Sequence, residues 1–167
     1  MRRVDREITQ REDMLAMLEH MPVLRLGLNY EGLAYIVPVN YGYIHEPLTF
    51  YVHSSCKGKK IELLRLNPHI SFELDGAHRL IHADEACGYS FAYDSIMGQA
   101  TVQFIEDKVE KIEALNHLMF KHTQKNDWTY ADASLDRVCV FKLDVTQWSA
   151  KRHLHPDDSP QAKENGI

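Results

Sequence analysis

Short stretches in which apolar and polar residues alternate constrain the fold of this chain more than any other feature. The first stretch covers residues 24–30, where every second residue is Leu or Tyr. A period of two is typical of a strand with one buried face. Five further segments with alternating, β-branched or aromatic residues also predict strands: 33–44, 48–54, 70–74, 90–106 and 137–145.

Few helices interrupt these strands. Apolar residues at helical spacing predict helices over residues 10–20 and 107–123, and a shorter helix that ends at Asn67-Pro68. Strands at this spacing, with few helices between them, favour an antiparallel arrangement over a parallel sheet. The predicted fold is therefore mainly β, a β-barrel with flanking helices.

The length of 167 residues suits one domain, and no linker divides the chain. Hydrophobic residues make up 44% and charged residues 26%, which is typical of a folded globular protein. After Trp148 the sequence becomes polar and contains prolines. We therefore expect a single domain over residues 1–150 and a flexible tail over residues 151–167.

Charge and cysteine content exclude several classes of protein. The formal net charge of −5 gives no overall positive field for nucleic acid or anionic lipid. No apolar run approaches the roughly 18 residues that span a membrane, and the first residues lack the apolar stretch of a signal peptide. The three cysteines have no metal or disulfide spacing, so we expect free thiols and a cytoplasmic protein without membrane or nucleic-acid partners.

A basic turn at residues 54–60 is the strongest local signal. It contains two hydroxyls and three ammonium groups, from Ser54, Ser55, Lys57, Lys59 and Lys60. Lysines at the start of a helix oppose the helix dipole unless they share a bound anion with the free backbone amides. The turn therefore suits a phosphate monoester, although a solvated basic turn explains the same residues. It lacks the glycine pattern of a nucleoside-triphosphate P-loop.

Two neighbouring features extend this candidate site. His53 directly precedes the basic turn and is a candidate contact for a bound ring, although most histidines in strands are satisfied by nearby protein groups. Segment 35–43 places tyrosines beside Pro38 and Gly42, where the backbone could approach a flat ligand; core packing would explain the tyrosines equally well. The remaining histidines have no zinc-site spacing, so no metal is expected.

Several segments, in this order, carry a resemblance to a known family. They are Arg3, Asp5 to Ile8, RLGLNYEGLAYIVPVNYGYI, FYVHSSCKGKKIELLRLNP, ISFELD, and Cys87 followed by YSFAYDSIMGQATV. Together they resemble the nitroimidazole-resistance branch of the pyridoxamine 5'-phosphate oxidase-like flavoproteins. The resemblance covers about residues 3–148.

This resemblance implies a split β-barrel that forms a homodimer, with two flavin mononucleotides (FMN) in clefts between the subunits. Residues expected along the isoalloxazine ring are Pro38, Val39, Asn40 and Tyr41, largely through their backbones. Residues expected around the ribityl phosphate are His53, Ser54, Ser55, Lys57, Lys59 and Lys60. Ser95 would also contact the cofactor, and Trp148 and Arg152 are similar to the C-terminal Trp and Arg that close the site in the oxidases.

Two positions depart from the family pattern. Cys56 stands where the oxidases carry an arginine, so phosphate binding would depend on lysines alone. Asp94 stands where this branch often has an arginine, which would put an acid near the flavin. The arginines that bind the substrate phosphate in the oxidases have no match, so oxidation of pyridoxamine phosphate is not expected.

The resemblance implies an FMN-dependent oxidoreductase that passes a hydride from flavin N5 to a nitroimidazole-like nitro compound or a quinone. His53 is the candidate catalytic residue. The alternative is a flavin-binding or haem-binding protein without efficient turnover, acting as a carrier or sensor. FAD could place its phosphate in the same turn, and related barrels also accept haem or a deazaflavin.

Overall fold

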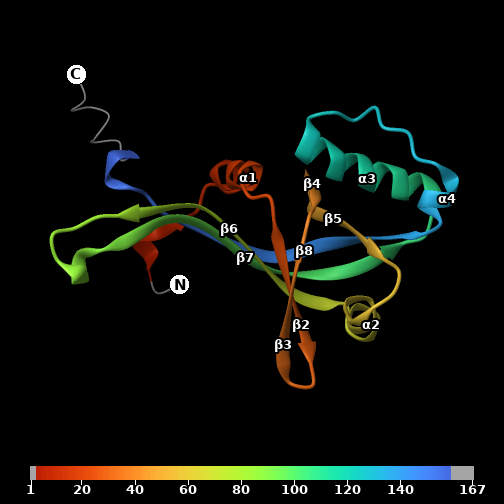
Figure 1. The fold of residues 1–167 in the computed structure, drawn as a ribbon, viewed down its shortest axis with the longest axis horizontal. Helices are drawn as coiled ribbons and strands as arrows, with labels where there is room; N and C mark the ends of the chain where they lie inside the picture. The colour runs from red at the N-terminus through yellow and green to blue at the C-terminus, as the bar shows by residue number, and fades with distance from the viewer. Residues whose placement is uncertain (1–2, 159–167) are drawn as a thin grey trace. The chain divides into compact units, whose positions relative to one another are not determined.

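The computed structural model describes residues 3–158, which divide into two compact units. The first unit contains residues 3–21, 75–96 and 149–158, and the second contains residues 22–74 and 97–148. Three long strands contribute to both units: β6 (His69–Ile81), β7 (Ser90–Ile105) and β8 (Val138–His153) (Figure 1). The final nine residues of the predicted tail, 159–167, lie outside the described residues.

The second unit holds most of the sheet. Its other strands are β2 (Leu24–Tyr30), β3 (Leu33–Val39), β4 (Gly42–His45) and β5 (Leu48–Ser55). The strand order is β3-β2-β6-β7-β8-β5-β4, and the described pairings in register are antiparallel. The prediction of a mainly β, antiparallel protein is confirmed.

The β2–β3 hairpin follows from two turn residues. Glu31 and Gly32 both have positive φ angles, 51° and 82°. Positive φ at both central residues gives a turn whose twist matches that of the flanking strands. The register Leu26↔Val37 on one side and Leu26↔Phe72 on the other places the alternating leucines of β2 in the core.

The helices include three that the sequence predicts, α1 (Arg11–Glu19), α2 (Lys59–Leu66) and α3 (Lys108–Thr123). Asp107 caps α3 by accepting hydrogen bonds from the amides of Val109 and Glu110, at 2.9 and 3.0 Å. The short α4 (Asp132–Leu135) was not predicted. Within the described residues, no helix combines the length and apolar character needed to cross a membrane.

Three strand boundaries differ from the predictions. The expected strand over 33–44 is two strands, because the chain leaves the sheet at Asn40 and Tyr41. Strand β6 continues to Ile81, through residues whose polar pattern gave no clear prediction. Strand β8 continues to His153, where its end pairs with β1 (Glu7–Ile8) through Lys151 and Ala150.

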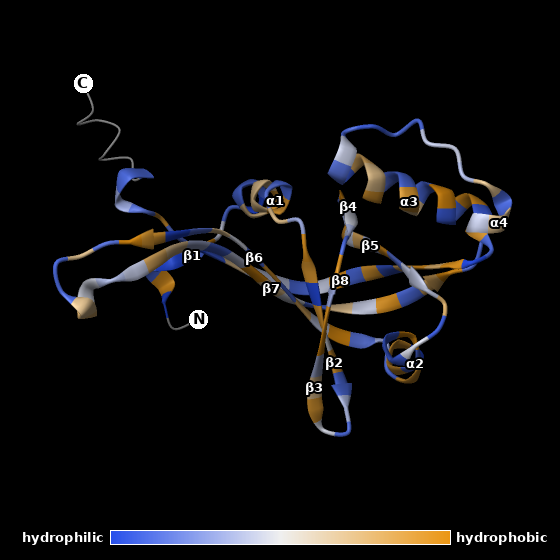
Figure 2. Cartoon of the chain, in the orientation of Figure 1, coloured by the Kyte–Doolittle hydropathy of each residue, from blue (hydrophilic) through white to orange (hydrophobic). Residues whose placement is uncertain are grey.

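Each unit has its own buried residues. In the second unit, α3 packs on β4 and β5, and Figure 2 shows hydrophobic and hydrophilic residues alternating along this helix. The buried face of this helix contributes Ala114 and Leu115 to a cluster that also contains Ile105, Leu135 and Val140. In the first unit, α1 buries Met14, Met17 and Leu18, which lie at helical spacing.

Candidate functional site

The basic turn joins the end of β5 to the start of α2. Gly58 precedes the helix with a φ of 110°, a value that favours glycine. Its carbonyl accepts hydrogen bonds from the amides of Ile61 and Glu62, at 3.0 and 3.2 Å. The amides of Lys59 and Lys60 come earlier in the helix, where the intrahelical pattern provides no carbonyl partner. These amides and the helix dipole make the turn favourable for an anion.

The three lysines of the turn have different surroundings. The Lys59 ammonium lies 2.8 Å from the centre of the Tyr30 ring, a cation–π contact. Lys57 is exposed, whereas Lys60 is half-buried, and this burial lowers the pKa of its ammonium group. Among residues 3–158, no carboxylate forms an ion pair with Lys60. Its charge is therefore available to an anion.

His53 lies one strand position before the two serines. Its pKa is lowered, mainly because neighbouring protein removes water from the ring and also because the Lys60 ammonium repels a proton. His53 is exposed, so a ligand can reach it. A neutral imidazole at this position can donate one hydrogen bond and accept another.

An open hollow of about 430 Å³ lies beside His53. Its lining residues are His53, Ser54, Ser55, Ser134, Arg137 and Val138. Arg137 keeps its guanidinium in place by donating from Nε to the carbonyl of Ala133 at 2.8 Å. Although Cys56 replaces the arginine of the family turn, an arginine from another part of the chain therefore shares this hollow with both serines.

Sequence analysis did not identify Ser134 or Arg137 as site residues. They lie about 80 positions after the serines in the chain, and the register Ser55↔Val138 brings the two segments together. No local pattern marks such a pair. The only available signal was a basic residue at the start of a predicted strand.

The residues expected along a flavin ring lie at the end of β3 and in the link to β4. Pro38 and Asn40 are exposed, whereas Val39 and Tyr41 are buried. The Tyr41 ring packs edge-on against Phe50, with centroids 5.3 Å apart, and the whole residue is 0% exposed, so neither its ring nor its backbone is open to a ligand. Pro38 lies on β3, an edge strand of the sheet, as its missing amide proton predicts.

Gly42 does not leave room for a ligand to approach the backbone. A Cβ at this position would collide with the backbone of His117 and Leu118, because α3 crosses directly over it. The prediction that this glycine exposes backbone to a flat ligand is wrong. The space is filled by the helix.

The remaining predicted contacts are divided between the units. Trp148 is half-buried on β8 in the second unit, and Ser95 is half-buried on β7 in the first. In the first unit the Asp94 carboxylate pairs with Arg152, which also raises the pKa of the Arg152 guanidinium. The expected acid is therefore neutralised by the arginine of its own unit.

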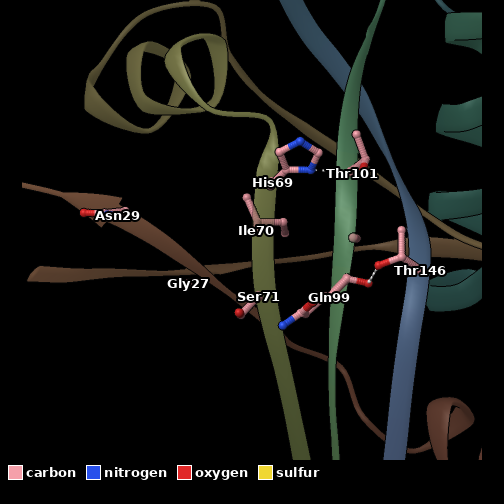
Figure 3. Close-up of a pocket in the computed structure, with 9 residues that line it drawn as sticks. Gly27, Asn29, His69, Ile70, Ser71, Gln99, Thr101 and Thr146 are labelled. Atoms are coloured by element: carbon pink, nitrogen blue, oxygen red, sulfur yellow. Dashed lines mark hydrogen bonds between the residues drawn. The ribbon is translucent and has the colours of Figure 1, made fainter. Parts of the chain in front are cut away.

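A second hollow, of about 400 Å³, lies on strands β2, β6, β7 and β8 (Figure 3). It is lined mainly by neutral polar groups, including Asn29, Ser71 and Gln99. His69 Nδ1 lies 3.4 Å from the Thr101 hydroxyl, and the Thr146 hydroxyl donates to the Gln99 carbonyl at 3.1 Å. None of its lining residues is a lysine or arginine, so the hollow beside His53 is the better candidate for a phosphate. Within the described part of the chain, no group of three or more His, Cys, Asp or Glu is arranged to hold a metal.

Comparisons with known proteins agree with the sequence resemblance. The family model described as pyridoxamine 5'-phosphate oxidase matches residues 10–152. A solved structure of a proposed 5-nitroimidazole antibiotic resistance protein from Bacteroides thetaiotaomicron is 31% identical. The match covers 87% of this chain and 86% of that one, with a TM-score of 0.77. A search of curated proteins finds no match.

Two more distant structures share the fold. The FAD and heme binding protein from Mycobacterium smegmatis is 18% identical, with a TM-score of 0.80 over 97% of this chain and 80% of that one. The flavocytochrome Anf3 from Azotobacter vinelandii is also 18% identical, with a TM-score of 0.77 over 100% of this chain and 78% of that one. The predicted split-barrel fold is confirmed by these comparisons.

Proposed function

This chain belongs to the pyridoxamine 5'-phosphate oxidase family, and on that premise we propose that it binds FMN and acts as a reductase. The basic turn between β5 and α2 is the observation that carries the proposal. It combines a helix N-terminus, two serine hydroxyls and a half-buried ammonium group. These are the donors that a phosphate monoester requires.

The chemistry of this donor set fits the phosphate of FMN. Burial lowers the pKa of Lys60, which means that the surroundings disfavour its charge in the absence of an anion. A phosphate dianion would compensate that cost, with Ser54 and Ser55 as additional donors. Arg137, which lines the hollow together with both serines, would add a second cation. FAD is the alternative ligand, since one of its phosphates could bind in the same turn.

The other end of the cofactor would lie along the end of β3. The exposed residues Pro38 and Asn40 would face the ring, whereas the fully buried Tyr41 would not contact it. A bound flavin supplies hydride chemistry at its N5 atom. The role of His53 would be to orient a substrate or the flavin by hydrogen bonding, because its lowered pKa keeps the ring neutral.

The proposed acceptors are nitro compounds of the nitroimidazole type and quinones. Support comes from the 31% identity with the Bacteroides thetaiotaomicron protein, which is described as a proposed 5-nitroimidazole resistance protein. The test is to photoreduce the FMN complex without oxygen and to follow flavin reoxidation after adding a nitroimidazole or a quinone. Reoxidation faster than that of free reduced FMN supports the reductase.

A His53→Gln variant separates positioning from binding in the same experiment. If His53 orients the acceptor, the variant should bind FMN normally and reoxidise it more slowly. FMN binding without accelerated reoxidation in the wild-type protein would contradict the reductase and favour a carrier or sensor.

We also propose that the protein is a homodimer with the flavin sites between its subunits. An apolar hollow of about 330 Å³ on the second unit is lined by Ile36 and Met97, whose side chains are exposed. Arg25 and Glu73 form an ion pair in its wall, with nitrogen and oxygen 3.0 Å apart. Exposed apolar residues beside charged groups are typical of a surface that another chain covers. Sedimentation at micromolar concentration should give a dimer, and a monomer would contradict this architecture.

A further inference from the structure

Two of the three cysteines meet beside the basic turn. Cys139 is buried on β8, directly opposite Ser54 on β5, and Cys56 is exposed two residues after Ser54. The Cys56 thiol turns back toward β8 and donates to the Arg137 carbonyl at 3.4 Å. Both sulfur atoms therefore lie over the same end of the β5–β8 pair.

The two thiols are also close enough for Cys56 to affect the pKa of Cys139. Burial is the main reason why the pKa of Cys139 is raised, and the second reason is the neighbouring Cys56, which acts through its charge and a side-chain hydrogen bond. The third cysteine, Cys87, is exposed in the first unit, in the short helix Ala86–Gly88. The geometry thus distinguishes one pair from one separate thiol.

We propose that Cys56 and Cys139 form an oxidative modification site, which a hydroperoxide converts into a reversible intramolecular disulfide. In the first step the Cys56 sulfur attacks the peroxide O–O bond, which gives a sulfenic acid and releases water or an alcohol. In the second step the Cys139 sulfur attacks the Cys56 sulfur and displaces hydroxide, which leaves as water with the Cys139 proton. Two thiols are oxidised and one peroxide is reduced.

The order of the two steps follows from exposure. Cys56 lies at the surface, where an oxidant can reach it. Cys139 is only 7% exposed, and burial raises the pKa of its thiol, so an oxidant attacks Cys56 first. An exposed thiol next to a second, resolving thiol is the usual arrangement of a redox-sensitive cysteine.

Disulfide formation would move the basic turn. Residues diagonally opposite on neighbouring strands have Cα atoms about 7–8 Å apart, whereas disulfides usually need about 4.4–6.8 Å. Cys56 would therefore have to shift toward β8, together with Lys57 and Gly58 at the start of α2. A change in FMN affinity on oxidation would follow, and this consequence alone rests on the proposed function.

The test is to treat the reduced protein with hydrogen peroxide, count free thiols and map the linked peptides by mass spectrometry without reduction. We expect the free thiols to fall from three to one, a Cys56–Cys139 linked peptide, and full recovery with dithiothreitol. Cys87→Ser is the matched control and should form the same disulfide. In the Cys139→Ala variant, oxidation should stop at a Cys56 sulfenic acid, which dimedone traps.

Three outcomes would overturn the proposal. The first is oxidation of Cys56 while Cys139 remains a free thiol in the wild-type protein. The second is a disulfide that includes Cys87, or one between two chains. The third is a Cys56→Ser variant that loses Cys139 thiol at the wild-type rate. Thiol counting needs no flavin. The disulfide can therefore be tested even if the protein does not bind FMN.

Discussion

The Asp94 carboxylate accepts two hydrogen bonds from the Arg152 guanidinium, 2.7 Å from Nε to Oδ1 and 2.8 Å from Nη2 to Oδ2. The two residues are 58 positions apart and meet across β7 and β8 in the first unit. Asp94 is only 9% exposed, and Arg152 is half-buried. This bidentate pair joins Asp94, which departs from the family pattern, to Arg152, which is similar to the C-terminal arginine of the oxidases.

Removal of one partner should destabilise the protein. Asp94→Ala would leave the Arg152 charge without its partner, and we expect a loss of about 2 kcal/mol in the free energy of unfolding, since Arg152 keeps some contact with water. Urea denaturation would measure this. The double variant Asp94→Ala/Arg152→Ala should lose about 1 kcal/mol less than the sum of the single variants. Additive losses would mean that the pair contributes no coupling energy.

A methyl group at Gly42 should be poorly tolerated. Because its Cβ would meet the backbone of His117 and Leu118, α3 would have to move away from β4. We expect Gly42→Ala to lower the free energy of unfolding by about 3 kcal/mol. Gly27→Ala is the control, because the nearest atom that its Cβ would meet, the Ser71 carbonyl oxygen, lies at 3.4 Å, an ordinary contact distance. Equal stability of the two variants would contradict the observed packing of α3.

Lys60 should contribute to binding through the phosphate alone. We expect Lys60→Gln to weaken FMN binding about tenfold, which corresponds to about 1.4 kcal/mol, and to leave riboflavin binding unchanged. Flavin fluorescence titration measures both ligands. Lys125→Gln, which removes an exposed lysine, controls for net charge and should bind FMN normally. If the variant loses FMN and riboflavin binding equally, Lys60 contacts the isoalloxazine ring and not the phosphate.

Acid should destabilise the fold through three histidines. Burial lowers the pKa values of His53, His117 and His122 below the ordinary value of 6.5. The unfolded chain therefore binds more protons, and stability is lost as the pH falls through about 6.5. Urea unfolding at about pH 7.5 and about pH 5.5 should show this loss, and His117→Gln should reduce it. Stability that is constant or higher at the acidic pH would be inconsistent with these environments.

The fold could be predicted from local patterns because each pattern reports a local constraint. The alternating leucines of 24–30 define a strand with one buried face, and Asp107 marks the start of α3. The end of β8 was missed because residues 146–153 are mostly polar and half-exposed, and their pairing with β1 depends on residues far away in the chain.

The candidate site could be predicted only where it is continuous in sequence. The serines and lysines of the basic turn stand next to one another, so their spacing reveals a helix start with excess positive charge. Arg137 reaches the same hollow only through the β5–β8 register. The covering of Gly42 by α3 is also a tertiary contact, and no local pattern distinguishes it from a glycine that faces a ligand.

The absorbance spectrum of the purified protein, with mass spectrometry of the small molecule released on heating, tests the central claim most directly. If the protein binds FMN, the spectrum should show flavin bands near about 370 and 450 nm, and the released molecule should have the mass of FMN. If the released molecule has the mass of FAD, the proposed site still stands and its ligand is FAD instead of FMN. A Soret band without flavin, or a colourless protein whose addition leaves the fluorescence of FMN unchanged, would contradict the account.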